Sequence, residues 1–242
     1  MRLQPALDLL SRVGALPPGP VVDLGCGSGV MGAALRSRFA DREILGIDKS
    51  PAMLAKADEA GGYDRLQEAD IAGWAPDAAP ALIFSNAALQ WLGDHPRLLP
   101  RLAATLAPRG LLAVQMPHQN SAPSHAGWGA AWAGLDGAAP PPEAGPAVLA
   151  PGDYFDLLAP LGEVTLWETD YLQHLAPAEQ GHPVRLFTQS TFARPYLAAL
   201  DGAGQQRLIA AYERAMARAY PLRADGSCLF PFRRLFLTLR PR

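Results

Sequence analysis

Residues 21–29 read Val-Val-Asp-Leu-Gly-Cys-Gly-Ser-Gly, and this stretch decides the fold of the chain. It opens with two β-branched apolar residues, which are typical of a buried strand. Three glycines then occupy alternate positions: Gly25, Gly27 and Gly29. Beyond them, large apolar side chains are spaced by four, as in a helix, at Met31, Leu35 and Phe39. This order predicts a turn whose backbone approaches a nucleotide-like ligand closely, because glycine adopts positive φ freely.

The spacing of the glycines indicates which class of ligand the turn can bind. A dinucleotide fingerprint, Gly-x-Gly-x-x-Gly, would need a third glycine where Val30 stands, and a P-loop would need Gly-Lys-Ser/Thr, which is absent here. The pattern that remains, Asp-x-Gly-x-Gly-x-Gly from Asp23, resembles the first motif of class I S-adenosylmethionine-dependent methyltransferases. The alternative is a glycine-rich turn of an α/β protein that has no such ligand.

A second apolar strand, residues 43–48, ends in an acid. At this distance past the glycine turn, the carboxylate of Asp48 is placed to accept hydrogen bonds from both hydroxyls of a ribose. The alternative is that Asp48 caps the helix that begins at Pro51. Ser50 can supply that cap with its own hydroxyl, so we expect Asp48 to be free for a ligand.

The amino-acid composition limits which binding partners and which cellular compartment are expected. The chain has 242 residues, a formal net charge of −2 and no long basic run, so an obligatory nucleic-acid partner is not expected. Cys26 and Cys228 are far apart in sequence and suggest neither a disulfide framework nor a metal site. The sequence shows no signal peptide and no membrane-spanning segment. We therefore expect a cytoplasmic protein without membrane contact, and a monomer.

The alternation of strands and helices predicts an α/β fold. We expect a Rossmann-like, mostly parallel sheet of about seven strands, with helices on both faces and a small helical cap. In such sheets the ligand lies beyond the carboxyl ends of the strands. Polar residues stand at five of the expected strand ends, at Asp23, Asp48, Asp70, Ser85/Asn86 and His118.

Two segments depart from this alternation. Residues 118–150 are rich in Ala, Gly and Pro, and we expect a mobile lid or insert there. Residues 183–220 have a broken helical pattern and are expected to form the cap. Both belong to a single expected methyltransferase domain, residues 1–242.

Longer motifs narrow the resemblance. The strings Asn86-Ala-Ala-Leu-Gln-Trp91 and Val114-Gln-Met-Pro117, with the glycine turn and the segment Gly46-Ile-Asp-Lys-Ser-Pro-Ala-Met-Leu54, resemble the trans-aconitate 2-methyltransferase family. The resemblance extends over nearly the whole chain. It implies an S-adenosylmethionine cofactor and methyl transfer to a carboxylate of a small polycarboxylic acid.

The family implies site residues position by position. For the cofactor they are Asp23, Gly25, Gly27, Gly29, Asp48, Lys49, Asp70, Ile71 and Asn86. For the acceptor acid the candidates are Trp91, His118, Arg194, Tyr220 and either Arg233 or Arg234, and of the arginines only Arg194 keeps its family position, before a proline. Core packing is the alternative for Trp91 and Tyr220, and a solvated charge is the alternative for each arginine. No acid–base catalyst is expected, because a carboxylic acid with a pKa near ~4 is already ionised at pH 7. No metal is expected either.

The chain also departs from the family pattern. Met1 stands almost at the point where the family still has preceding residues, some of them aromatics that fold over the cofactor. Phe187, Phe192 and Val30 replace a tryptophan, a glycine and an asparagine. Two other functions therefore stay open: a methyltransferase for a different small molecule, and a cofactor-binding module without catalysis. Val30 argues against a nicotinamide-dependent oxidoreductase.

Overall fold

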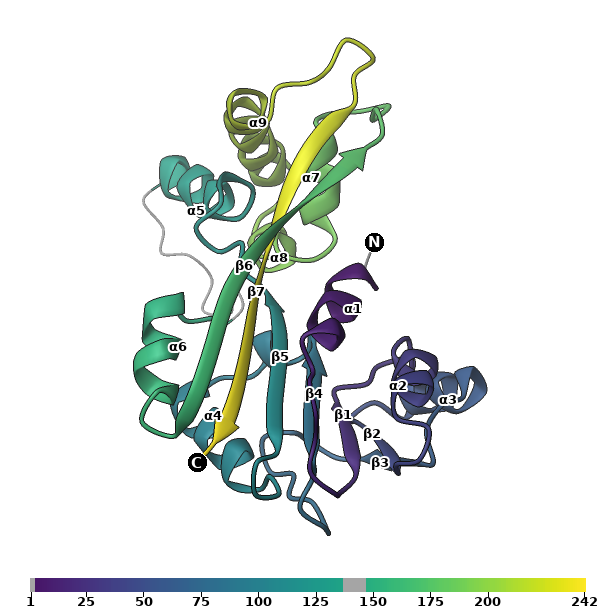
Figure 1. The fold of residues 1–242 in the computed structure, drawn as a ribbon. Helices are drawn as coiled ribbons and strands as arrows, with labels where there is room; N and C mark the ends of the chain where they lie inside the picture. The colour runs from purple at the N-terminus through teal and green to yellow at the C-terminus, as the bar shows by residue number, and fades with distance from the viewer. Residues whose placement is uncertain (1–2, 137–146) are drawn as a thin grey trace. The chain divides into compact units, whose positions relative to one another are not determined.

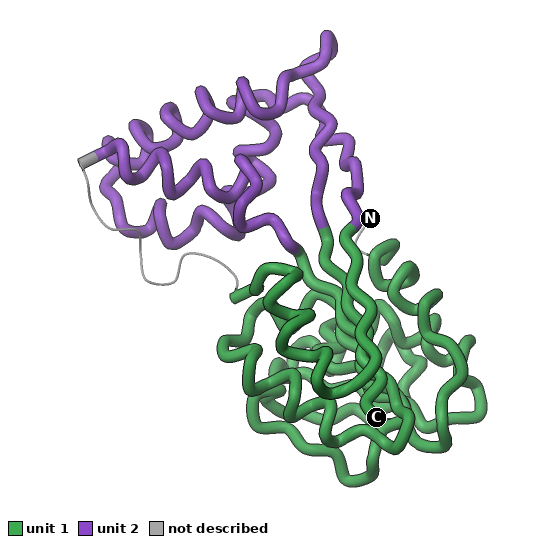
Figure 2. The backbone as a smooth tube through the Cα atoms, turned by 60° about the vertical axis from the view of Figure 1, so that its left-hand side comes forward, with its two compact units in different colours: residues 1–117, 147–168, 234–242 green, residues 118–146, 169–233 purple. Residues whose placement is uncertain are grey.

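The computed structural model describes residues 3–136 and 147–242. The chain forms two compact units, shown in two colours in Figure 2. Unit 1 comprises residues 1–117, 147–168 and 234–242, and unit 2 comprises residues 118–146 and 169–233. Among the described residues, no helix is both long enough and apolar enough to cross a membrane.

Unit 1 holds the sheet that carries the glycine turn (Figure 1). Its five parallel strands are β1 (Val21–Leu24), β2 (Ile44–Asp48), β3 (Arg65–Glu68), β4 (Leu82–Asn86) and β5 (Leu111–Pro117). Two long strands, β6 (Gly162–Leu175) and β7 (Cys228–Pro241), begin or end in it. Its helices are α1 (Gln4–Ser11), α2 (Gly32–Arg38), α3 (Pro51–Ala60), α4 (His95–Ala104) and α6 (Pro151–Leu158), with a short 3₁₀ turn at Leu89–Trp91.

The strand order is β3-β2-β1-β4-β5-β7-β6. The first five strands pair in parallel, and β7 pairs antiparallel with β5. The chain builds the sheet from β1 outward to β3 and then returns to place β4 on the other side of β1. This reversal creates a switch point between β1 and β4, where open α/β sheets bind their ligands. The predicted mostly parallel, seven-stranded α/β fold is confirmed.

The apolar strands are continuous because both faces of the sheet are covered. All four residues of β1 are buried, as are the first four of β2 and of β4. The side chains of Leu112 and Val114 on β5 pack into one cluster with α4 and α6, while α1 also packs against β5. This burial makes the strand ends a rigid edge for the turns that follow them.

Unit 2 is mainly helical, with α5 (Pro123–Asp136), α7 (Pro183–Gln189), α8 (Arg194–Ala198) and α9 (Gly202–Ala219). Aromatic side chains dominate its core, where the rings of Trp128 and Tyr212 stack with centroids 3.8 Å apart. The segment expected as a cap thus forms α7 to α9. The segment expected as a lid, residues 118–150, contains α5, and its residues 137–146 lie outside the described part of the chain. Its mobility stays a prediction.

Candidate functional site

The turns that follow β1 and β4 meet at the switch point. A Cβ added to Gly25 would lie 2.2 Å from the Cβ of Ala88 and 3.5 Å from Ile71. A Cβ added to Gly29 would lie 2.8 Å from the Cα of Ala57, on α3. Neither position has room for a side chain, so Gly25 and Gly29 allow the turn to pack closely against its neighbours in unit 1.

Gly27 has a different environment. Its φ is +54° and no heavy atom lies within 4 Å of a Cβ built there. Its N–H donates a hydrogen bond of 2.9 Å to Oδ2 of Asp48. The middle of the turn is thus an open backbone surface, held from below by a carboxylate, and it leaves space for a ligand.

Asp48 holds two segments at once. Its Oδ1 accepts a 2.9 Å hydrogen bond from the backbone N–H of Ser50, at the start of α3. The side chain of Ser50 makes no capping hydrogen bond, so the expectation that Ser50 would cap this helix and leave Asp48 free is wrong. Each carboxylate oxygen can accept a further bond, and Asp48 is only half-buried, so it still has acceptors for a ribose.

Asp23 lies beneath the turn and is 2% exposed. The hydroxyl of Tyr63 donates a 2.7 Å hydrogen bond to its Oδ2. Burial raises the pKa of Asp23 from 3.8 to about 7; the bond from Tyr63 opposes this rise and the charge of Asp48 adds to it. Asp23 is therefore a support below the ligand surface, and near neutral pH it exchanges a proton.

Sequence reasoning missed Tyr63. Gly61 and Gly62 stand directly before it, and a glycine pair at this place ordinarily indicates only the end of a helix. Both glycines have positive φ, +74° and +96°, and this geometry turns the chain so that the tyrosine points back under β1. Two glycines directly before an aromatic residue were the available signal.

The remaining cofactor candidates lie on either side of the turn. Ile71 is buried, and its carbonyl accepts a 2.7 Å bond from Arg101. Asp70 is exposed two residues beyond the end of β3, and its Oδ1 accepts a 2.9 Å bond from the N–H of Ala72. Lys49 is exposed. The structure thus places Ile71 against Gly25, whereas Asp70 and Lys49 lie at the surface.

Unpaired amide atoms gather in β4 and β5 and in the short turn after β4. Asn86 and Gln115 are partners in the ladder that joins these strands. Oδ1 of Asn86, Oε1 of Gln90 and both amide atoms of Gln115 are buried and have no hydrogen-bond partner among the described residues. Leaving such groups unpaired costs roughly 1–3 kcal/mol each. Gln115, which the sequence analysis quoted only as part of a motif, is therefore a candidate to contact a ligand or a bound water.

The acceptor candidates are divided between the units. In unit 1, Trp91 is 71% exposed, so its alternative interpretation as a core residue is wrong. Arg234 is half-buried on β7, opposite Pro117. In unit 2, Tyr220 is buried in the aromatic core, and its hydroxyl accepts a 3.2 Å bond from the N–H of Ser124. The backbone N–H of His118 donates a 3.0 Å bond to the carbonyl of Arg233.

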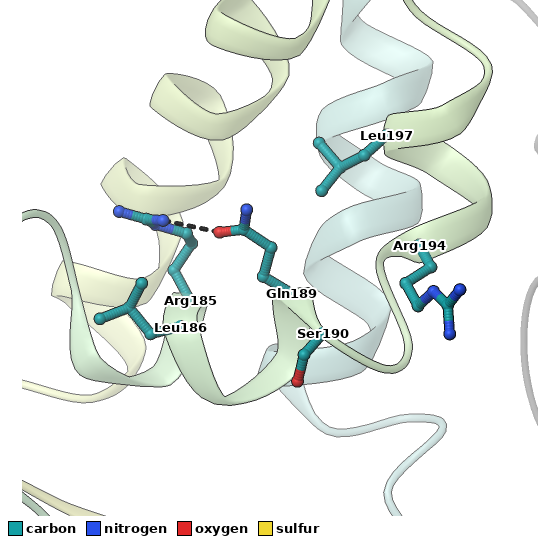
Figure 3. Close-up of a pocket in the computed structure, with 6 residues that line it drawn as sticks. All are labelled: Arg185, Leu186, Gln189, Ser190, Arg194 and Leu197. Carbon is teal, nitrogen blue, oxygen red and sulfur yellow. Dashed lines mark hydrogen bonds between the residues drawn. The ribbon is translucent and has the colours of Figure 1, made fainter.

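Arg194 begins α8 and lies at the rim of a pocket in unit 2 (Figure 3). The same pocket includes Arg185, whose guanidinium is occupied by Glu213 and Gln189 at 2.8 and 2.6 Å. The guanidinium of Arg194 is exposed and points away from that group. Among the described residues it has no ion-pair partner, and it remains available for an anionic ligand.

The site in unit 1 combines an open turn, the half-buried acid Asp48 for a diol, and the buried carboxyl group of Asp23, which attracts a cation. No group of three or more metal-ligating side chains occurs among the described residues. These features fit S-adenosylmethionine, which has a ribose and an amino-acid end with an ammonium group.

Comparison with known proteins agrees with this geometry. A family described as a methyltransferase domain matches residues 2–194. The fold is similar to that of the YcgJ protein of Bacillus subtilis (TM-score 0.64, 13% identity, 99% of this chain and 98% of that chain). It is also similar to phosphoethanolamine N-methyltransferase 2 of Haemonchus contortus, crystallised with S-adenosyl-L-methionine (TM-score 0.57, 16% identity, 98% and 52%). Fold and site together define a class I methyltransferase.

Sequence similarity assigns the chain to a particular family within this class. The chain is 42% identical to trans-aconitate 2-methyltransferase of Methylobacterium radiotolerans over 247 residues, which cover 99% of this chain and 93% of that protein. It is 41% identical to the enzyme of the same name from Variovorax paradoxus, over 100% and 94% of the two chains. The chain belongs to the trans-aconitate 2-methyltransferase family, whose methyl donor is S-adenosylmethionine.

The three glycines should respond differently to alanine. Gly25→Ala should lower the free energy of unfolding by more than about 2 kcal/mol, because the new methyl group overlaps Ala88. Gly27→Ala should cost only about 1–2 kcal/mol, the strain of a positive φ, yet weaken S-adenosylhomocysteine binding because its methyl enters the open space. Urea unfolding and calorimetry measure both effects; equal losses of stability would contradict these roles.

Asp23→Asn should change how stability depends on pH. The folded-state pKa of Asp23 lies above its ordinary value, so its contribution to stability is complete below pH ~4 and is lost as the pH rises through about 7. The neutral amide avoids this loss. The melting temperature of the variant should therefore gain at least about 3 °C on wild type between pH 5.5 and pH 8. Parallel melting profiles across this range would show that Asp23 does not titrate there.

Proposed function

We propose that this chain transfers the methyl group of S-adenosylmethionine to a carboxylate of a small polycarboxylic acid such as trans-aconitate. The identity of 42% over 99% of the chain to a protein with that name carries the proposal. The switch-point site of unit 1 supports it, because an open glycine turn with Asp48 beside it suits the cofactor. The acceptor would be a small molecule, since the net charge of −2 offers no broad basic surface for nucleic acid.

Methyl transfer to a carboxylate needs little general acid–base catalysis from the protein. When bound, S-adenosylmethionine supplies an electrophilic methyl group, and the acceptor carboxylate is already ionised at neutral pH. The protein has to orient the carboxylate, exclude water and balance the remaining charges of the acid. Arginine suits the last task because its planar guanidinium binds a carboxylate through two hydrogen bonds.

Among Arg194, Arg233 and Arg234, exposure and the absence of a described ion-pair partner favour Arg194 for this role. Arg233 is held by a two-pronged ion pair to Asp170, with distances of 2.8 and 3.0 Å. Arg194 is exposed and unpaired within the described part of the chain. Its place before Pro195, at the start of α8, keeps the backbone angle at that point fixed. We propose that His118, Tyr220, Trp91 and Arg234 help to enclose the acid.

The roles of the larger segments follow from the same proposal. The two compact units would act together as one methyltransferase domain, with residues 183–220 as a cap and residues 118–150 as a mobile lid. We further propose that the protein works in the cytoplasm as a monomer. Light scattering tests its mass, and hydrogen exchange with and without S-adenosylhomocysteine plus acid tests the lid, where equal protection in both states would indicate a fixed insert.

Direct assay tests the function. Purified protein incubated with S-adenosylmethionine and trans-aconitate should yield a methyl ester, detected by mass spectrometry, and S-adenosylhomocysteine. A panel of other small acids and neutral acceptors is the control. Product with a different acceptor alone would replace the proposed substrate, and cofactor binding without turnover on any acceptor would make the chain a binding module.

Arg194→Lys should lower kcat/KM for the acid at least roughly tenfold, or about 1.4 kcal/mol, because lysine keeps the charge but loses the planar fork. Affinity for S-adenosylhomocysteine should stay unchanged. Arg218→Lys, at an exposed position on α9, is the matched control and should behave as wild type. Wild-type kinetics in Arg194→Lys would remove this residue from the acceptor site.

Gln115→Met should affect stability and activity in opposite ways. The substitution removes two unpaired buried polar atoms, so the melting temperature should stay level or rise, while kcat/KM falls by roughly tenfold or more if the amide serves the ligand. Gln119→Met is the control: Gln119 is also buried, but its amide donates a 2.8 Å bond to Pro231, so its loss should lower the melting temperature. Unchanged kinetics in Gln115→Met would make that side chain a packing residue only.

A further inference from the structure

The ring of Tyr63 fills a space that two glycines leave open. A Cβ on Gly32, at the start of α2, would lie 2.8 Å from the ring, and a Cβ on Gly46, in β2, would lie 3.0 Å from it. The same Cβ on Gly46 would lie 3.1 Å from Sγ of Cys26, in the glycine turn. Tyr63 is therefore packed between α2 and β2, directly below the turn.

The residue after Tyr63 anchors its loop. The N–H of Asp64 donates a 2.9 Å bond to the carbonyl of Ile44, and Oδ2 of Asp64 accepts a 2.7 Å bond from the N–H of the same residue. Arg36 on α2 also donates to Oδ2 of Asp64. The backbone next to Tyr63 is thus fixed to the first residue of β2, and the direction of the tyrosine hydroxyl is fixed with it.

The charges around Asp23 are unbalanced. The ionisable groups that face it are Tyr63, Asp48 of β2 and Cys26 of the turn. Burial raises the pKa of the tyrosine hydroxyl and of the thiol far above neutral, so both stay protonated and Tyr63 remains a donor. Asp23 has no ion-pair partner within the two described ranges, 3–136 and 147–242. A cation bound on the turn would balance its charge.

We propose that Tyr63 is a positioning residue of the cofactor site: its hydroxyl stabilises the ionised form of Asp23 and holds it beneath the glycine turn, where the carboxylate attracts the ammonium group of the amino-acid end of S-adenosylmethionine. This inference rests on the proposed cofactor. Tyr63 itself does not touch the ligand; it acts through Asp23. The hydrogen bond that Tyr63 donates favours the ionised carboxylate over the protonated one. It therefore affects cofactor binding through the negative charge on Asp23.

Proton linkage follows from this arrangement. Cofactor binding selects the ionised form of Asp23. Near pH 7, the fraction of protein molecules in which Asp23 is protonated must therefore release that proton when the cofactor binds. The apparent affinity scales with the ionised fraction. With a free-protein pKa of about 7, S-adenosylhomocysteine should bind about tenfold more tightly at pH 8 than at pH 6. Its amino group stays cationic over this range.

The experiment is calorimetric titration of S-adenosylhomocysteine into wild type, Tyr63→Phe and Asp23→Asn at pH 6, 7 and 8, in two buffers of different ionisation enthalpy. Tyr63→Phe keeps the ring and removes only the donor. Its affinity profile should move to higher pH by about one unit, which weakens binding about fivefold at pH 7. Asp23→Asn should bind independently of pH and release no proton.

Tyr154→Phe is the matched control. Its buried hydroxyl, on α6, bonds to His95 at 2.6 Å and accepts a bond from Leu149 at 3.2 Å. Its removal should lower the melting temperature while leaving the pH profile of binding as in wild type. A wild-type profile in Tyr63→Phe, or an equal loss of affinity at every pH, would overturn the proposal. Wild-type protein that binds no S-adenosylhomocysteine would instead overturn the proposed cofactor.

Discussion

The carboxylate of Asp48 accepts backbone N–H groups from Gly27 and Ser50, and the cofactor site depends on these two bonds. They join the end of β2 to the glycine turn and to the start of α3. Once the turn is held there, Gly25 and Gly29 can pack against Ala88 and Ala57 without side chains in the way. One carboxylate therefore sets the position of the turn relative to the elements on both sides.

The same region carries more negative charge than its own side chains balance. Asp23 is buried without an ion-pair partner in the described parts of the chain, and Asp48 raises its pKa further. Burying an unbalanced charge costs free energy, which a cationic ligand recovers on binding. The free protein is thus destabilised at the point where S-adenosylmethionine would bind, and the bond from Tyr63 limits that cost by favouring the ionised form.

Other polar groups follow the same principle. Asn86, Gln90 and Gln115 hold amide atoms that are buried and unpaired within the described residues. Natural sequences usually satisfy such groups or remove them, and they tolerate exceptions where function needs them. These amides differ for that reason from the apolar side chains that surround them.

The sequence by itself determined the order of strands and helices, the glycine turn and the family. Each of these depends on local patterns: continuous apolar runs, glycine spacing and an acid at the end of β2. Only the tertiary structure showed that Tyr63 lies under Asp23, that Asp48 rather than the Ser50 side chain bonds to the start of α3, that Trp91 is exposed and that Gln115 is unpaired. Hydrogen bonds and burial between segments distant in the sequence decide those features, and a local pattern does not encode them.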